Sequence, residues 1–174
     1  MMPICVDLDG TLIDEDVTLK ALEIYVKSDF SNIFRVILWL LRGRAYLKHQ
    51  LAQFVRLDVS SLSYNDNLLK YIAKKKSDGC KIFLATACNR VYAEDIADHL
   101  GIFDGVFASS DCVNLRAEAK ALALVMMFGE NGFVYAGNSH DDVCVWGKSA
   151  ECVVVSPSIG VLWRMRNRPY LLLK

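Results

Sequence analysis

The chain has 174 residues, of which 53% are hydrophobic, and its 20 basic and 20 acidic residues give a formal net charge of zero. Such a composition supports a large core and excludes an intrinsically disordered chain. Because the net charge is zero and no basic stripe occurs, we expect no nucleic acid among the partners.

The first predicted elements are a strand and three helices. Residues 3–8 form a short apolar run typical of a buried strand. Apolar residues at helical spacing predict helices over 17–28, 31–42 and 44–56. The small polar residues of 57–64 then predict a linker.

Beyond this linker strands and helices alternate, which predicts a parallel sheet with helices on both faces. The expected elements are a helix over 66–77, a strand over 80–86, a helix over 90–101, a strand over 105–109, a helix over 115–128 with Asn114 as its N-cap, a strand over 132–137, a helix near 141–149, a strand over 151–155 and a final helix opened by Ser156 and Pro157. We therefore predict an α/β fold: a Rossmann-like open parallel sheet with a small helical cap inserted after the first strand. The core comprises residues 1–14 and 64–174, and the cap comprises residues 15–63.

Polar residues follow three of the predicted strands. They are Asp7 and Asp9 after the first strand, Thr86 at the end of the second, and Gly137, Asn138, Asp141 and Asp142 at and beyond the end of the strand over 132–137. Ligands of open parallel sheets bind beyond the carboxyl ends of the strands, so we expect these residues at one rim. Two carboxylates at positions i and i+2 face the same way and repel each other unless a cation such as Mg²⁺ lies between them. The pattern indicates a metal-assisted reactive centre, and the alternative is that Asp7 only starts a turn.

Three sequence motifs resemble those of the haloacid dehalogenase (HAD) superfamily of aspartate-nucleophile phosphotransferases. The run "ICVDLDGT" is similar to the first motif, Thr86 in "IFLATAC" to the second, and "GNSHDD" to the acidic fourth motif. More narrowly, "VILWLLRGRAYLKHQLA", "YAGNSHDDVCVW" and "VVVSPS" resemble the HAD-type domain that is fused to UbiA-like prenyltransferases. The resemblance implies the HAD fold, in which an insertion after the first motif forms a cap that helps to choose the substrate.

The resemblance also implies catalytic roles. Asp7 is the implied nucleophile, which forms an aspartyl-phosphate, and Asp9 is the implied general acid and base. The cation of the third motif is either Lys120 or Arg116, which we expect four residues apart on one helix face. The residue type favours Lys120, whereas the spacing to the fourth motif favours Arg116.

Further residues of these motifs are implied to bind phosphate and metal. The implied phosphate-binding residues are Thr86 and Ala87, with Asn89 close by, and Gly10 and Thr11 of the first motif. The implied cofactor is Mg²⁺, held by Asp7, Asp9 through its backbone carbonyl, Asn138, and Asp142 or Asp141. Asn138 departs from the family, which most often has a metal-binding aspartate there, and its neutral oxygen is the weaker ligand.

The expected function is a Mg²⁺-dependent phosphatase that hydrolyses the phosphomonoester of a small metabolite or of a phosphoprotein. One alternative is a phosphotyrosine-type protein phosphatase within a larger membrane-associated protein. An alternative of another class is a non-catalytic HAD-like docking module, because Asn138 weakens the metal site. The presence of both Asp7 and Asp9 favours the enzyme.

The middle helix of the predicted cap is apolar on nearly all sides. We expect either a buried central helix or an apolar surface for a lipid-like substrate, a membrane or a partner. The basic residues that flank it are Arg35, Arg42, Arg44 and Lys48. Membrane or lipid contact is expected through this helix or through a further C-terminal region. The abrupt apolar end "RPYLLLK" indicates either a fragment of a longer protein or a relative that kept this domain and acquired another partner.

The six cysteines have no metal-site spacing, and most lie in or beside apolar strand-like runs, so we expect buried thiols in a reducing compartment. An acidic motif follows the N-terminus too closely for a signal peptide. The longest apolar run, residues 36–41, is too short to span a bilayer. These features predict a cytoplasmic protein.

Overall fold

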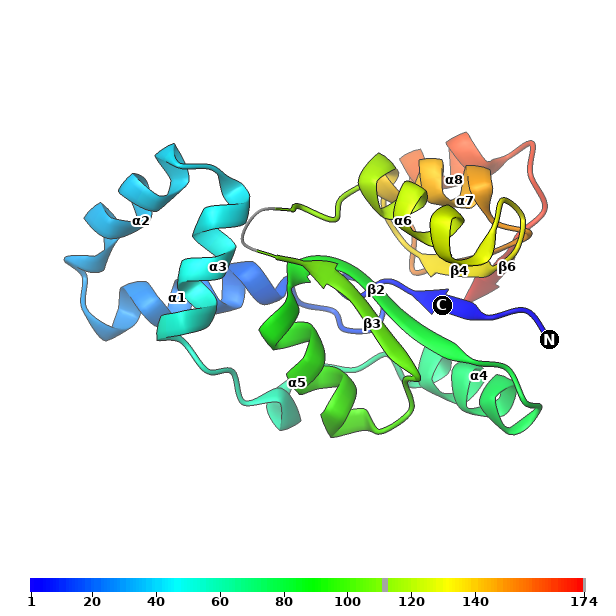
Figure 1. The fold of residues 1–174 in the computed structure, drawn as a ribbon, viewed down its shortest axis with the longest axis horizontal. Coiled ribbons are helices and arrows are strands. Elements are labelled where there is room, and N and C mark those ends of the chain that lie inside the picture. The colour runs from blue at the N-terminus through cyan, green and yellow to red at the C-terminus, as the bar shows by residue number, and fades with distance from the viewer. Residues whose placement is uncertain (111–112, 174) are drawn as a thin grey trace.

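The protein is described by a computed structural model that covers residues 1–110 and 113–173. At its centre lies a six-stranded sheet of parallel neighbours in the order β3-β2-β1-β4-β5-β6 (Figure 1). The strands are β1 (Ile4–Val6), β2 (Ile82–Asn89), β3 (Gly105–Ser109), β4 (Val134–Gly137), β5 (Glu151–Val155) and β6 (Leu171–Leu173). The predicted α/β class is therefore confirmed.

Helices cover both faces of this sheet. On one face lie α4 (Asp66–Ser77) and α5 (Arg90–Leu100), and on the other lie α6 (Glu118–Phe128), α7 (Val143–Lys148) and α8 (Ile159–Met165) (Figure 1). Two short 3₁₀ helices, η1 (Val59–Ser61) and η2 (His140–Asp142), precede α4 and α7.

Successive side chains of each strand enter two separate hydrophobic clusters. In β1, Ile4 and Val6 pack in the cluster of α4 and α5, whereas Cys5 packs in the cluster of α6, α7 and α8. In β4, Ala136 belongs to the first cluster and Tyr135 to the second. Neighbouring strand residues point to opposite faces and both faces are covered, which explains why the strands are almost continuously apolar.

The chain reverses its direction of travel across the sheet at β1. It passes from β1 to β2 and β3 on one side, and then crosses through α6 to β4, β5 and β6 on the other side. The crevice at such a reversal, beyond the carboxyl ends of the strands, is the usual ligand site of an open α/β sheet. Asp7 follows β1 and Asn138 follows β4, so both lie at this crevice.

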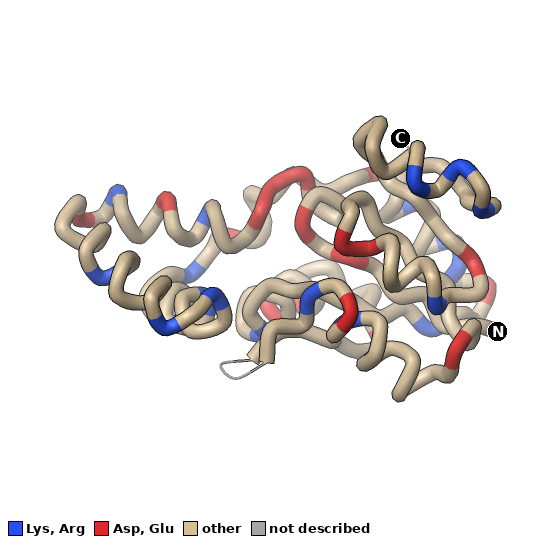
Figure 2. Tube along the Cα trace, turned by 90° about the horizontal axis from the view of Figure 1, so that it is seen from above, with Lys and Arg blue, Asp and Glu red and all other residues tan. Residues whose placement is uncertain are grey.

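Three helices between β1 and β2 form a layer beyond this end of the sheet, and we call them the cap (Figure 1). They are α1 (Val17–Ser28), α2 (Asn32–Leu41) and α3 (Arg44–Phe54). The two segments that connect the cap to the core lie side by side and form what we call the neck. In the neck, Ile13 and Tyr64 form an antiparallel bridge, and the Asp14 N–H donates to the Ser63 carbonyl at 3.0 Å. Acidic residues gather where the chain enters the cap (Figure 2).

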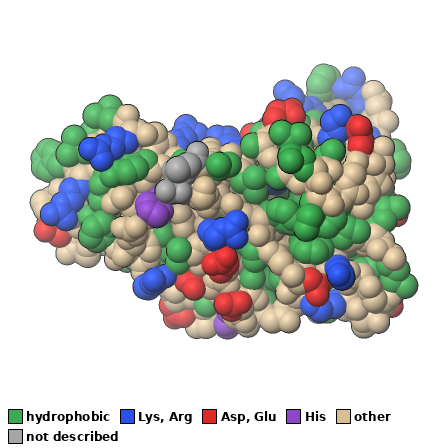
Figure 3. Space-filling view, viewed as in Figure 1, with side chains coloured by type: hydrophobic (Ala, Val, Ile, Leu, Met, Phe, Trp, Pro, Cys, Tyr) green, Lys and Arg blue, Asp and Glu red, His purple; other side chains and the backbone are tan. Residues whose placement is uncertain are grey.

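The middle helix of the cap, α2, is exposed, so its interpretation as a buried central helix is wrong. Only Asn32 is buried in α2, whereas Phe34 is 70% exposed and Leu41 79% exposed. The helix is attached mainly through Trp39, which stacks on Tyr25 of α1 with ring centroids 5.1 Å apart. Hydrophobic side chains interspersed with basic ones therefore cover this end of the molecule (Figure 3).

No helix within the described part of the chain has the length and apolar character needed to cross a membrane. The five cysteines in this part are free thiols, and Cys5, Cys88 and Cys152 are buried as expected. Cys80 and Cys144 are only partly buried, which corrects the expectation for these two. The sixth, Cys112, lies outside the described residues.

The start of α6 differs from the prediction. This helix begins at Glu118, and Asn114 is not its N-cap. The Leu115 N–H donates to Ser109 Oγ at 2.8 Å, and Ala117 has a φ of +48°, which is outside the helical range. Residues 113–117 therefore form a loop that carries Arg116 ahead of the helix.

The C-terminal part differs in two further respects. Ser156 has a φ of +41°, so α8 begins only at Ile159, with Ser158 at the N-cap position. The apolar end of the sequence contains the sixth strand, β6, which pairs in parallel with β5 and was not predicted. Three exposed or half-exposed leucines make up this strand, so no alternation of polar and apolar residues indicates it.

Candidate active site

Asp7 lies directly after β1, with its side chain almost wholly buried. Its backbone N–H donates to the Ala136 carbonyl at 2.9 Å, which extends the pairing of β1 with β4 by one residue. Lys120 Nζ on α6 donates to Asp7 Oδ1 at 2.6 Å, and Thr11 Oγ1 donates a longer bond to Oδ2 at 3.3 Å. One oxygen of Asp7 therefore has a charged partner, and the other is only weakly engaged.

Lys120 links Asp7 to a second buried carboxylate, Asp142. Its Nζ lies 3.5 Å from Asp142 Oδ1 and donates to the Tyr135 hydroxyl at 2.9 Å. Tyr135 in turn donates to Asp142 Oδ1 at 2.6 Å. These four side chains are buried, and we call them the buried network.

One lysine serves two carboxylates in the buried network, and the two titrate differently. Burial raises the pKa of Asp7 above its usual range against the opposing charge of Lys120, and the charge of Asp142 adds to the rise. For Asp142, burial is outweighed by Lys120 and by several hydrogen bonds, which lower its pKa. Burial also lowers the pKa of Lys120, but the two carboxylates outweigh it and hold that pKa above the usual value. Lys120 therefore stays charged at neutral pH.

Asp142 also organises the loop after β4. Its Oδ2 accepts the N–H groups of Asn138 and Ser139 at 3.1 and 2.9 Å, and the Ser139 hydroxyl at 2.8 Å. Gly137 permits this approach, because a Cβ at this position would lie 2.7 Å from Asp142 Cγ. Both oxygens of Asp142 thus already accept hydrogen bonds, so the structure gives no support to Asp142 as a metal ligand.

Asp9 lines the same cavity as Asp7 but is held differently. Because β1 ends at Val6, the two aspartates are not placed by strand alternation, which corrects that part of the sequence argument. Asp9 Oδ1 accepts the N–H of Val17, the first residue of α1, at 2.8 Å. Burial raises the pKa of Asp9 to about 7 against this hydrogen bond, and the charges of Asp16 and Asp7 add to the rise. Asp9 is therefore poised to exchange a proton near neutral pH.

The end of β2 carries a bulge that shapes the predicted phosphate loop. The register of β2 against β3 shifts between Ala85 and Asn89. Within the bulge, Thr86 is fully buried and its Oγ1 accepts the Cys88 N–H at 3.0 Å. Ala87 lines the cavity, but Thr86 and Asn89 do not.

Asn89 has a structural role that the sequence did not predict. Its Oδ1 accepts the Val91 N–H at 3.0 Å, which caps the N-terminus of α5. The structure therefore explains Asn89 without a bound phosphate.

Arg116 and Lys120 do not share a helix face, because Arg116 precedes α6. The Nε of Arg116 donates to Asp141 Oδ2 in an ion pair, and both side chains are partly exposed beside the cavity. Lys120 contacts Asp7 itself. The geometry therefore favours Lys120 as the cation of the third motif, and the ion pair leaves Asp141 poorly suited to bind a metal.

Oxygen atoms suited to a metal ion remain on Asp7, Asp9 and Asn138. Asn138 Oδ1 is buried and has no hydrogen-bond partner within the described residues, which is costly unless a ligand supplies one. The Asn138 side chain packs on Gly10, where φ is +71° and a Cβ would come within 2.3 Å of Asn138 Nδ2. Gly10 is thus required for this packing.

This oxygen set fits Mg²⁺ better than a metal that needs many protein ligands. In the described part of the chain, no three His, Cys, Asp or Glu side chains form a metal cluster. Mg²⁺ usually binds through one or two carboxylates, and waters and substrate phosphate oxygens complete its octahedron. Asp7, the backbone carbonyl of Asp9 and Asn138 Oδ1 would meet that need.

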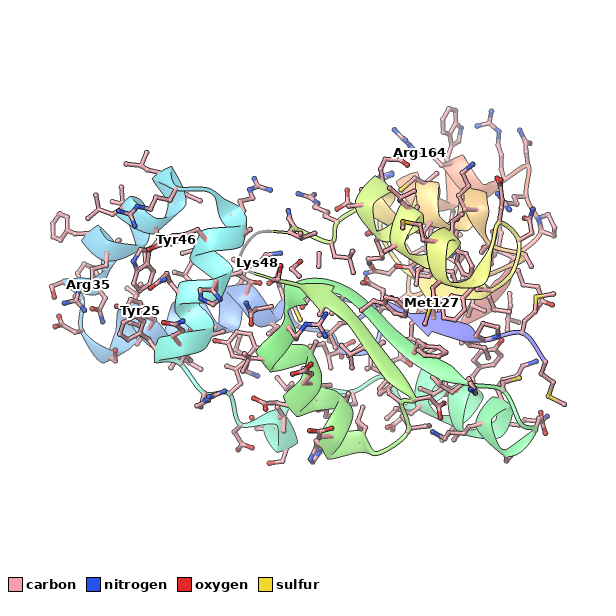
Figure 4. All side chains as sticks on the ribbon, viewed as in Figure 1. Tyr25, Arg35, Tyr46, Lys48, Met127 and Arg164 are labelled. Atoms are coloured by element: carbon pink, nitrogen blue, oxygen red, sulfur yellow. The ribbon has the colours of Figure 1, made fainter. Side chains whose placement is uncertain are left out.

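A cavity of about 440 Å³ lies between the cap and the carboxyl end of the sheet. The core contributes Asp7, Asp9 and Lys120, and all three cap helices contribute further residues. Lys48 of α3 reaches from the cap and donates to the Ala87 carbonyl at 2.5 Å (Figure 4). Of the basic residues that flank α2, Lys48 therefore turns its side chain toward the cavity.

Several of these residues were missed at the level of sequence. Tyr135 is two residues before the end of β4 and points to the face covered by α6, which carries Lys120, and this strand parity was the available signal. Ser139 lies within the fourth motif and was not singled out. For Lys48 no local pattern indicates a partner 39 residues away in the chain.

Replacing Tyr135 with Phe should destabilise the protein by about 1–3 kcal/mol, because the hydroxyl bonds to two buried charged groups. The measurement is the free energy of unfolding in urea. Tyr25→Phe is the matched control, because the buried Tyr25 hydroxyl has no hydrogen-bond partner within the described residues, and its loss should be close to neutral. Equal effects of the two substitutions would contradict the importance of the buried network.

No protein family model matches the chain. Over 166 residues it is 34% identical to the uncharacterized protein y4nM of Sinorhizobium fredii. The aligned region covers 95% of this chain and 32% of that protein. The chain thus spans about a third of the length of the curated relative that it matches.

Solved structures share the fold at low sequence identity. A HAD family hydrolase from Salmonella enterica serovar Typhi has a TM-score of 0.68 and 12% identity, over 93% of this chain and 66% of that one. A phosphoserine phosphatase in its apo form has a TM-score of 0.67 and 15% identity, over 99% of this chain and 92% of that one. The chain therefore has the α/β fold of HAD hydrolases. The narrower resemblance to domains fused to UbiA-like prenyltransferases stays a prediction.

Proposed function

We propose that the chain is a Mg²⁺-dependent phosphatase that hydrolyses small phosphomonoesters through an aspartyl-phosphate on Asp7. The observation that carries this proposal is the buried Asp7 carboxylate, held by Lys120 and placed beside Asp9 in one cavity. The fold shared with a HAD hydrolase and with a phosphoserine phosphatase supports the same chemistry.

The residues of the site have complementary tasks in two steps. In the first, a carboxylate oxygen of Asp7 attacks phosphorus, the bond to the ester oxygen breaks, and Asp9 gives its proton to the leaving oxygen. In the second, Asp9 takes a proton from water, which attacks the aspartyl-phosphate, releases inorganic phosphate and restores Asp7. The charge of Lys120 favours the ionised form of Asp7 against the effect of burial, and it offsets negative charge as phosphate enters.

The proposed metal ligands are Asp7, the Asp9 backbone carbonyl and Asn138. Bound Mg²⁺ would neutralise the charge of the phosphate and so reduce its repulsion with Asp7. Asn138 supplies a neutral oxygen, so we expect weak binding of the metal. Roles for Thr86, Ala87, Gly10 and Thr11 in holding phosphate stay predictions.

Hydrolysis of 4-nitrophenyl phosphate should require Mg²⁺, stop in EDTA and recover when Mg²⁺ is added in excess. Asn138→Asp adds a charged ligand and should lower the Mg²⁺ concentration that gives half-maximal activity. The measurement is release of inorganic phosphate against Mg²⁺ concentration. Absence of turnover with Mg²⁺ or Mn²⁺, from protein with an intact circular dichroism spectrum, would overturn the proposal and favour the non-catalytic docking module.

The pH dependence of alkyl phosphate hydrolysis should follow Asp9. Because the pKa of Asp9 is raised to about 7, Asp9 carries the proton that the leaving oxygen needs when the pH is below 7. At pH values well above 7, kcat/KM should therefore fall about tenfold per pH unit. Nitrophenolate leaves without a proton, so 4-nitrophenyl phosphate should show a much shallower decline. An unchanged alkaline limb in Asp9→Asn would assign that limb to another group.

A phosphoprotein substrate and contact with a membrane through α2 both stay predictions. A site of about 440 Å³ lies within the usual range for small-molecule ligands, so the volume favours a small phosphomonoester.

A further inference from the structure

The cap side of the cavity carries two cations that form no ion pair within the described residues. Arg44 and Lys48 of α3 both line the cavity. Arg44 is exposed and makes no hydrogen bond or ion pair within the described residues, and the one hydrogen bond of Lys48 goes to the neutral Ala87 carbonyl. By contrast, Arg116 and Lys120 on the core side are paired with carboxylates.

The negative charges of Asp9 and Asp16 act on Lys48, but no carboxylate of the described residues forms an ion pair with either cap cation. Asp9 and Asp16 also line the cavity, but neither forms an ion pair with Lys48 or Arg44. Asp16 instead caps α1 by accepting the Leu19 N–H at 2.9 Å. Asp9 Oδ1 accepts the N–H of Val17. The two cations are therefore free to bind an anion that enters the cavity.

The two cations are arranged along the path of a ligand. They are four residues apart and so lie on the same face of α3, with their backbones separated by about 6 Å along the helix axis. Lys48 is the inner one, because it contacts Ala87 at the predicted phosphate loop. Apolar side chains from each cap helix complete this wall: Leu19, Leu40 and Leu47.

We propose that the substrate is a small phosphomonoester whose alcohol part carries a second anionic group, a carboxylate or a second phosphate, bound by Arg44 and Lys48. A short carbon chain would lie against the three leucines between this group and the ester oxygen. The inference rests on the proposed phosphatase function and adds the substrate class to it. Arg44 and Lys48 are then specificity-determining residues.

The test compares kcat/KM for four matched substrates. They are propyl phosphate, the phosphate ester of 3-hydroxypropanoate, propane-1,3-diol bisphosphate and a phosphotyrosine peptide. We expect one or both of the doubly anionic small esters to exceed propyl phosphate by at least about thirtyfold, because a site with charged donors discriminates against a ligand that lacks their partner. The ester that exceeds propyl phosphate identifies the second group as carboxylate or phosphate.

Variants then assign this preference to the cap. In the double variant Arg44→Gln and Lys48→Gln, the ratio of kcat/KM for the preferred anionic ester over propyl phosphate should fall at least about tenfold. Arg35→Gln, at the outer end of the cap, is the control and should leave the ratio unchanged (Figure 4).

Four outcomes would overturn the inference. Equal kcat/KM for propyl phosphate and both anionic esters, or preference for the peptide, would overturn it while leaving the phosphatase intact. An equal loss on all substrates in the double variant would also overturn it, because the two cations would then serve the transferred phosphate. No turnover of any ester would overturn the phosphatase itself and the inference with it.

Discussion

Replacing Asp7 with Asn should abolish phosphomonoester hydrolysis, with a loss in kcat of at least about a thousandfold. The amide has no nucleophilic carboxylate oxygen, so no aspartyl-phosphate can form. The measurement is steady-state release of phosphate, together with acid-quench trapping of labelled phosphate on the protein. The wild-type protein should retain label, and the variant should not.

The fold should survive this substitution. Burial raises the pKa of Asp7, which means that the ionised form is disfavoured in the folded state, and Lys120 keeps Asp142 as a partner. Asp98→Asn, on the exposed side of α5, is the matched control and should retain full activity. Residual activity of Asp7→Asn above a few per cent, with no deamidation by mass spectrometry, would show that another residue is the nucleophile.

Replacing Lys120 with Met should destabilise the protein by about 3–5 kcal/mol at neutral pH and reduce kcat at least about a hundredfold. The substitution leaves Asp7 and Asp142 buried without a cation between them, which is the costly case for a buried charge network. The measurements are urea unfolding and hydrolysis of 4-nitrophenyl phosphate. Lys70→Met, on an exposed position of α4, should change neither quantity.

The same variant should acquire a distinctive pH dependence of stability. Without Lys120, the folded-state pKa of Asp7 rises further, and Asp142 loses the charge that lowers its pKa. A carboxyl group whose pKa is higher in the folded state binds more protons there. The free energy of unfolding therefore decreases as the pH rises from the pKa of the unfolded state to the pKa of the folded state. Lys120→Met should therefore be closest to the wild type in mild acid. A deficit that does not change with pH would indicate a packing defect instead.

The sequence predicts the sheet well because its strands are short apolar runs bounded by polar residues at the crevice. Ile4, Val6 and Leu84 carry this pattern, and the same rule of strand ends brings Asp7 and Asn138 together. The expected helical pattern fails where a side chain outside a helix takes over a backbone group ahead of its start. The Ser109 hydroxyl delays α6 in this way, so the helical spacing of Arg116 and Lys120 is misleading.

The cap is the part that local patterns describe least well. The apolar sequence of α2 fits burial as well as exposure, and only the packing of Trp39 on Tyr25 decides between them. Lys48, Arg35 and Arg42 are all positively charged, but of these three only Lys48 lines the cavity. Which lysine or arginine of a helix enters a site depends on how the helix docks, and no residue spacing within the cap encodes that.

The neck closes the cap insertion at its base. Its two segments are held together by the Asp14–Ser63 hydrogen bond and by a second hydrogen bond from the Asn65 N–H to the Leu12 carbonyl at 2.9 Å. The sheet therefore receives the insertion as a loop that is already closed at its base, and the entropic cost of closing a loop grows only slowly with its length. A cap of another size or charge could replace residues 17–55 while β1 and β2 keep their pairing. One sheet could in this way be combined with caps that select different ligands.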